Sequence, residues 1–253
     1  MMKKTVKEIS DLFLSLNKIS RLFILTGFFI SFYSFFFFMS NKVFLIGSDA
    51  FYYMSIADSI VKYGEMRDIT AIPSFPVKSP QNGIVFIHVI LSLTGIGAKA
   101  RILTIVVINY LLYLSGVYPL YKVAHWCGFR KGLPLAALLS VHLGAWHIYR
   151  INLLAINDGI FNSLILWFVY MVIKFIRDMD VIEFRSSYKP AITIMMIISL
   201  LLIVLIQFRL NAALVIGSAI ISTLAIRNYK ASLLLITVCV FLFISFLSVY
   251  LFV

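Results

Sequence analysis

The sequence predicts an all-α polytopic membrane protein with about seven transmembrane helices. Hydrophobic residues make up 62% of the 253 residues, charged residues make up only 13%, and the mean hydropathy is +1.02. A soluble domain of this length cannot bury so many apolar side chains. The apolar runs are also long and unbroken, which favours transmembrane helices over the short alternating strands of a β-barrel.

The first hundred residues comprise an amphipathic segment, an apolar span and a long polar loop. Residues 1–21 mix basic residues with apolar ones at helical spacing, which predicts an amphipathic segment on the cytoplasmic face. Residues 22–46 form a Phe-rich first span, interpreted as an uncleaved signal anchor. Residues 47–100 follow as an extracytoplasmic loop with juxtamembrane helices. In this loop we expect a surface helix over residues 50–63, with Phe51 and Val61 on its apolar face and Gly64 at its end. Prolines should then keep the chain irregular up to a short apolar helix, too short to cross, over residues 84–96.

The positions of the basic residues set the topology. Most of the 22 Lys and Arg residues fall on the cytoplasmic side if residues 84–96 do not cross the membrane. A crossing there would move Arg130, Lys131, Arg227 and Lys230 outside. We therefore expect a single membrane domain over residues 1–253, with a cytoplasmic N-terminus, in the cytoplasmic membrane of a bacterium. The expected spans are residues 22–46, 102–124, 133–149, 159–175, 191–208, 212–226 and 231–253.

The net charge of +12 does not indicate a nucleic-acid partner, because the basic residues are scattered between apolar runs as topology signals. Cys127 and Cys239 lie far apart, in or beside apolar runs, so we expect neither a disulfide nor a metal site from them.

Asp49 lies where the first apolar run ends, at the expected extracytoplasmic membrane surface. The topology puts Arg150, Asp158 and Arg209 on the same side, each at the end of a later span. Acidic residues number only ten in the chain, so two of them at span ends on one side indicate a site.

These features, taken in order, resemble the N-terminal module of the GT-C superfamily of integral membrane glycosyltransferases. The resemblance rests on the stretch from Ser48 to Ile60, on a Pro-containing loop that runs into a short apolar helix, on Arg101 at the start of the next span, and on Arg150 followed eight residues later by Asp158. Asp49-Ala50-Phe51-Tyr52 is also similar to the Asp-x-Tyr-Tyr motif of the oligosaccharyltransferase catalytic subunit, with Phe51 in place of the first Tyr.

The resemblance implies an inverting transfer of a sugar from a polyprenyl-phosphate donor to a lipid, glycan or protein acceptor on the extracytoplasmic side. It implies that Asp49 activates or orients the acceptor, that Asp158 contacts acceptor, donor or metal, and that Arg209 contacts the donor phosphate. Lys78 matches a substrate-binding position. Members usually continue beyond a seventh span, so we expect a partner subunit or a further C-terminal part to complete the donor pocket.

The chemistry of such a transfer needs the same residue types. A carboxylate accepts the acceptor's proton, and a guanidinium forks onto two phosphate oxygens. Arg150 or Lys78 can assist Arg209 in this role. A divalent cation shared by Asp49 and Asp158 is an open alternative; no other cofactor is expected.

Other polar residues have simpler interpretations beside functional ones. Tyr53 is an interface aromatic or a platform for a sugar ring, and His147 is a packing residue or part of the pocket lining. We expect His88 to be a hydrogen-bonded packing residue, Asp58 to lie on a solvated helix face, and Arg101 to be a membrane-boundary residue.

A non-catalytic membrane protein, either a transporter of lipid-linked saccharides or an assembly subunit, is the alternative function. A transporter should carry charges or broken helices near the bilayer midplane. The predicted span centres are nearly free of charge and no inverted repeat is evident, which favours the enzyme.

Overall fold

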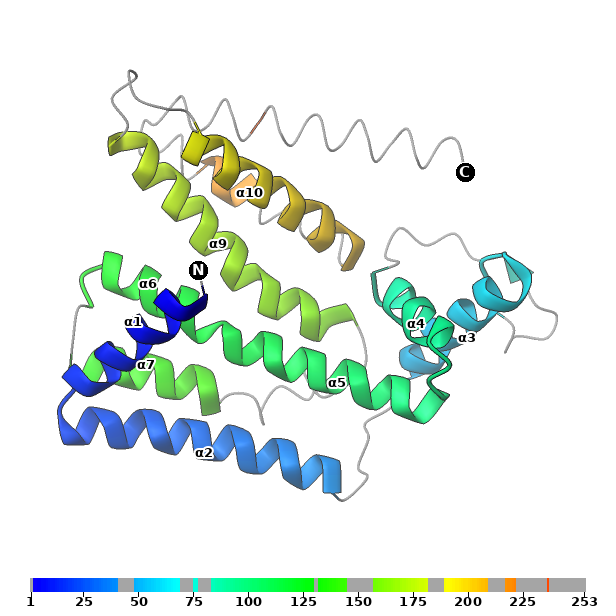
Figure 1. The fold of residues 1–253 in the computed structure, drawn as a ribbon, viewed down its shortest axis with the longest axis horizontal. Coiled ribbons are helices and arrows are strands. Elements are labelled where there is room, and N and C mark those ends of the chain that lie inside the picture. The colour runs from blue at the N-terminus through cyan, green and yellow to red at the C-terminus, as the bar shows by residue number, and fades with distance from the viewer. Residues whose placement is uncertain are drawn as a thin grey trace. The chain divides into compact units, whose positions relative to one another are not determined.

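The computed structural model describes residues 2–40, 48–68, 75–76, 83–129, 132–144, 157–181, 189–208, 217–221 and 236. In these ranges the chain is almost wholly helical, which confirms the all-α part of the prediction (Figure 1). The number of about seven transmembrane helices stays a prediction. The described strands are β1 (Arg67–Asp68) and β2 (Phe75–Pro76), which form a two-residue antiparallel ladder. We expected no regular structure around the prolines of this segment.

Three of the described helices are long and apolar enough to cross a membrane. They cover Lys18–Phe37, Ala98–Trp126 and Gly159–Asp178. Shorter apolar helices cover Gly83–Leu93, Leu133–Gly144 and Met196–Leu205. The chain is therefore compatible with a membrane protein.

The chain divides into two compact units. The first comprises residues 1–78 and 84–163, and the second comprises residues 79–83 and 164–253. The single membrane domain expected from the sequence stays a prediction.

The boundary between the amphipathic segment and the first apolar helix lies after Ser15, not after Arg21 as expected. Helix α1 (Met2–Ser15) ends before Leu16, and α2 (Lys18–Ser40) starts four residues before the expected first span. The Asn17 side chain accepts a hydrogen bond from the Ser20 amide at 2.8 Å, as an N-cap residue does. Arg21 donates to the carbonyl oxygens of Leu16, at 2.9 Å, and Leu14, so a cation stabilises the C-terminal end of α1.

Helices α5 (Ala98–Ser115) and α6 (Val117–Trp126) form the longest apolar stretch among the described helices and run antiparallel to α2. Ile24 of α2 packs against the cluster that contains Ala124, near the end of α6. Farther along α2, the Phe35 ring stacks on Tyr110 at 4.2 Å. Residue numbers therefore rise along α2 while those of its partners fall, so the segment between α2 and α5 starts and ends at the same end of this helix group.

Helix α7 (Leu133–Gly144) packs along α2 and α6 in the first unit (Figure 1). The His142 ring stacks on Tyr113 at 4.4 Å, and one of its ring nitrogens lies 3.2 Å from the Tyr113 carbonyl oxygen. At Gly27 of α2, an added Cβ would lie 2.6 Å from the carbonyl oxygen of Ser140. Close helix approach at a small residue is typical of membrane helices, where backbones pack without intervening side chains.

An ion pair connects helix α1 to the C-terminal half of α6. Lys122 and Glu8 form an ion pair with 2.7 Å between Nζ and Oε2. The pair brings the N-terminal helix and the C-terminal half of α6 to one end of the first unit.

Helix α9 (Asn157–Val181) begins in the first unit, where Gly159 meets Asn109 of α5 so closely that an added Cβ would overlap the Asn109 side chain. In the second unit, α9 buries a helical stripe that includes Phe168 and Phe175. Helix α10 (Lys189–Phe208) buries a similar stripe at Ile198, Leu202 and Leu205. Stripes of this spacing are what helices that pack along one face display.

We predict that Gly27→Ala destabilises the protein by roughly 1–3 kcal/mol, because the new methyl group forces backbone atoms of α7 to move. The measurement is the free energy of unfolding in mixed micelles titrated with SDS. Gly144→Ala is the matched control, since no heavy atom lies within 4 Å of a Cβ placed there. Equal stability of the two variants would show that α2 and α7 do not approach closely at Gly27.

Candidate functional site

Two of the candidate acidic residues lie in the first turn of a helix. Asp49 is the second residue of α3 (Ser48–Tyr63), and Asp158 is the second residue of α9. The first turn of a helix presents unpaired backbone N–H groups, which favour a nearby carboxylate. The side chains of both residues lie outside the described part of the structure.

The rest of the predicted set is only partly described. The Tyr53 side chain is half-buried on α3, with its ring centroid 5.7 Å from that of Tyr52. The described residues neither bring the predicted set together nor separate it. The residues of the set that lie outside the described ranges are Lys78, His147, Arg150 and Arg209.

Helix α3 is packed into the protein rather than lying free on a surface. Ala50, Met54 and Ala57 are buried, whereas Phe51 and Val61, expected on the same apolar face, are exposed. Gly64 ends the helix as expected and adopts a left-handed φ of 72°, which suits glycine. The buried side of α3 also carries the polar residues Ser55 and Ser59.

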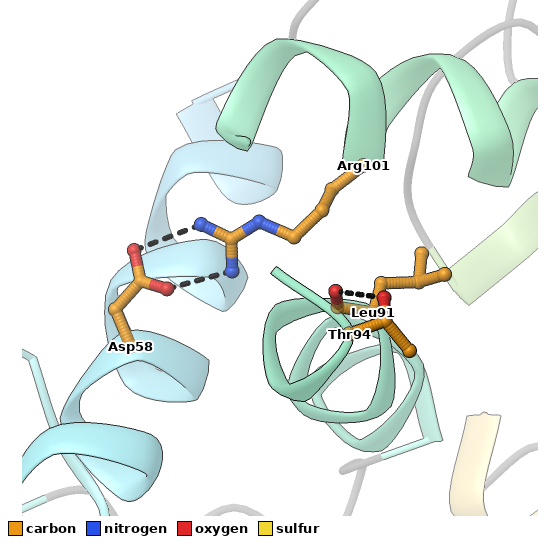
Figure 2. A network of polar contacts seen from close by, with 4 residues as sticks. All are labelled: Asp58, Leu91, Thr94 and Arg101. Atoms are coloured by element: carbon orange, nitrogen blue, oxygen red, sulfur yellow. Dashed lines mark hydrogen bonds and ion pairs between the residues drawn. The ribbon is translucent and has the colours of Figure 1, made fainter. Parts of the chain in front are cut away.

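A bidentate ion pair joins α3 to the first turn of α5 (Figure 2). The two terminal guanidinium nitrogens of Arg101 donate to Asp58, at 2.6 Å to Oδ1 and 3.1 Å to Oδ2. The Arg101 side chain is only 6% exposed and the Asp58 side chain is 38% exposed. Parallel N–H···O bonds between guanidinium and carboxylate fix both distance and orientation.

This pair corrects two sequence-based interpretations. Arg101 is not a boundary residue that reaches for water, and the Asp58 carboxylate is bound by a guanidinium instead of being fully solvated. Sequence reasoning missed the pair because 43 residues separate its members. The sequence did offer one signal. Arg101 stands at the start of an apolar run, and Asp58 lies beside serines on an otherwise apolar helix.

The charges of Arg101 and Asp58 both act on the His88 imidazole. It is fully buried on α4 (Gly83–Leu93), and neither ring nitrogen has a hydrogen-bond partner among the residues that the structure describes. Burial is the main cause that lowers the pKa of His88 from 6.5 to about 4; the Arg101 charge lowers it further and Asp58 partly opposes both. The imidazole is therefore neutral near pH 7. The packing role is as expected, but the hydrogen bond is not found in this part of the chain.

Two more buried polar atoms belong to Arg101 and to Ser59, the residue that follows Asp58. Arg101 Nε and Ser59 Oγ have no hydrogen-bond partner within the described ranges. Burial of a donor without a partner costs stability. We use the name α3–α5 cluster for Asp58, Ser59, His88 and Arg101.

The α3–α5 cluster does not itself supply a catalytic base. The Asp58 carboxylate is already bound by Arg101, and the His88 imidazole is buried. The described residues also contain no group of three His, Cys, Asp or Glu side chains that could hold a metal ion. The carboxylate on α3 that remains for acid–base chemistry is Asp49, nine residues before Asp58.

Comparison with known proteins gives no match to a family model, to a curated protein or to a solved structure. The resemblance to the GT-C superfamily stays a prediction.

We predict that the protein loses about 2 kcal/mol of unfolding free energy between pH 7 and pH 5 through His88. The unfolded imidazole binds a proton below pH 6.5, whereas the folded one stays neutral until about pH 4, so acid favours the unfolded state. SDS titration at pH 7 and at pH 5 measures this loss. In His88→Leu, the loss of unfolding free energy between the two pH values should be about 2 kcal/mol smaller than in the wild type. A His88→Leu variant with the full pH dependence of the wild type would show that His88 is not the group responsible.

Proposed function

We propose that the protein is an inverting GT-C-like glycosyltransferase that moves a sugar from a polyprenyl-phosphate donor to an acceptor on the extracytoplasmic side of the membrane. The observation that carries the proposal is the position of Asp49 in the first turn of α3, a helix anchored to α5 through the buried Arg101. A carboxylate on a firmly held helix outside the span is what activation of an incoming acceptor requires.

The proposed topology has seven spans with a cytoplasmic N-terminus in a bacterial cytoplasmic membrane. The antiparallel packing of α2 against α5 and α6 supports it, because residues 41–97 then begin and end on one side. The Glu8–Lys122 ion pair gives further support, since the positive-inside rule places both ends on the cytoplasmic side. Helix α4, with 11 residues, is too short to cross.

In the proposed reaction, Asp49 accepts the proton of the acceptor hydroxyl or amine as that group attacks the anomeric carbon of the sugar. The bond between that carbon and the phosphate oxygen breaks, and polyprenyl phosphate leaves. Arg209, assisted by Arg150 or Lys78, stabilises the charge on the departing phosphate. Asp158 orients a substrate or shares a divalent cation with Asp49. A phosphate is a good leaving group, so no separate general acid is needed.

We predict that Asp49→Asn lowers transfer by about 10²-fold or more, because the amide cannot accept the acceptor's proton. The measurement is transfer of label from a panel of radiolabelled polyprenyl-phosphate sugars to the lipid, glycan and protein fractions of membranes. Glu65→Gln is the matched control from the same loop: Glu65 forms an exposed pair with Arg67 and should tolerate the change. Wild-type turnover by Asp49→Asn would remove Asp49 from catalysis.

We predict that Arg209→Ala weakens donor binding by roughly 10- to 100-fold, which corresponds to the loss of hydrogen bonds to a charged group. Binding of a fluorescent polyprenyl phosphate to the purified protein in nanodiscs measures the effect. Arg177→Ala, at an exposed position of α9 near its C-terminal end, is the control and should leave the affinity unchanged. An unaltered affinity in Arg209→Ala would exclude a role of this guanidinium in holding the phosphate.

A further inference from the structure

We infer that Asp58 and Arg101 are positioning residues that fix the Asp49 carboxylate for catalysis by locking α3 against the first turn of α5. This inference rests on the proposed function and adds to it. Neither residue touches the reacting atoms, so both act through the orientation of α3.

The geometry of α3 makes the position of Asp49 sensitive to the pair. The helix runs without interruption from Ser48 to Tyr63, so Asp49 and Asp58 move as parts of one rigid element. Nine residues at about 1.5 Å each separate them by about 13.5 Å along the axis. A tilt of roughly 4° about Asp58 would then displace the Asp49 backbone by about 1 Å. Misplacement of about 1 Å can cost about 10²-fold in rate.

Helix α5 is a suitable anchor because it is held from several directions in the first unit. The Tyr110 hydroxyl is 3.3 Å from Ser31 Oγ on α2, and its ring stacks on Phe35. Tyr113, one turn further on, donates to the carbonyl oxygen of His142 on α7. Arg101 thus extends a firmly packed helix group to α3 through two parallel hydrogen bonds.

The partial burial of the pair, with Arg101 buried and the Asp58 side chain 38% exposed, favours a directional role over a purely stabilising one. A buried ion pair often contributes no more stability than apolar side chains of similar volume would, and an exposed pair contributes about 1 kcal/mol or less. It does define one geometry, because a fork of two N–H groups meets two carboxylate oxygens in a single plane. The pair is also the charged link between α3 and α5 within the described residues. The nearby His88 is fully buried and neutral near pH 7, so it adds no charge that competes for either partner.

The test uses full-length protein in nanodiscs and three changes of the pair. Arg101→Lys keeps the charge but loses the fork, and Asp58→Asn leaves the Arg101 charge without its partner. The double change Asp58→Arg with Arg101→Asp restores the pair in reverse. We expect kcat to fall about 10- to 100-fold in Arg101→Lys and further in Asp58→Asn, with the donor KM changed less than about 3-fold. The reversed pair should recover at least about 10-fold of the loss relative to Asp58→Asn.

A second readout does not depend on activity. Spin labels at Lys62 of α3 and Lys99 of α5, both exposed, report the distance between the two helices by double electron–electron resonance. A narrow distance distribution is expected in the wild type, a broader or shifted one in Arg101→Lys, and a narrow one again in the reversed pair. Glu8→Gln is the matched control, because it breaks the ion pair of Lys122 on α6 and should change neither kcat nor this distribution.

The outcomes separate this inference from the proposed function. Full turnover by folded Arg101→Lys, while Asp49→Asn is inactive, overturns the positioning role and leaves the proposed function standing. A loss of kcat with an unchanged distance distribution also overturns it, because the effect would not pass through α3. Full turnover by Asp49→Asn contradicts the proposed function itself, and with it the purpose assigned to the pair.

Discussion

The bidentate ion pair between Asp58 and Arg101 is the interaction on which the account of this protein depends. It ties the helix that begins with Ser48-Asp49 to the start of the long helical stretch from Ala98 to Trp126. Without it, α3 would be a juxtamembrane helix with no charged link to α5 in the described part of the chain. With it, the backbone of Asp49 has a defined position relative to α5. Position and direction, more than net stability, are what a partly buried bidentate pair contributes.

The contacts among α2, α5, α6 and α7 are consistent with a single arrangement of these helices. Helix α2 runs antiparallel to α5 and α6, and α7 lies along α2 and α6. Small residues permit the closest approaches, at Gly27 against Ser140 and at Gly159 against Asn109. The second of these sets the start of α9, and therefore the backbone of Asp158, against the side of α5. Packing through small residues and single hydrogen bonds suits a medium in which apolar surface alone does not hold helices together.

The sequence predicted local features well and long-range ones poorly. Within the described ranges the long apolar runs predicted where helices lie, and Gly64 marked the end of α3 correctly because a left-handed residue is a local requirement. The expected spans 212–226 and 231–253 lie mostly outside the described residues. The boundary between the amphipathic segment and the first span was expected after Arg21 but lies after Ser15. Asn17 ahead of Ser20 is the capping signal for the true boundary, and it was overlooked because the apolar pattern continues across it. The Asp58–Arg101 pair could not be predicted, since nothing in single-residue patterns states which charges meet across 43 positions. Four candidate residues, Lys78, His147, Arg150 and Arg209, are still known only from their sequence positions.

The central claim is that α3 carries its carboxylate on the extracytoplasmic side, opposite the end of α6. The native Cys127, free and exposed just after α6, makes a direct measurement practicable. Cys239→Ser leaves it as the internal reference, and Lys62→Cys adds an exposed thiol on α3. In intact cells, a membrane-impermeant maleimide should label position 62 at once and Cys127 only after permeabilisation. Labelling of both thiols from the same side, or of Cys127 alone in intact cells, would contradict the account.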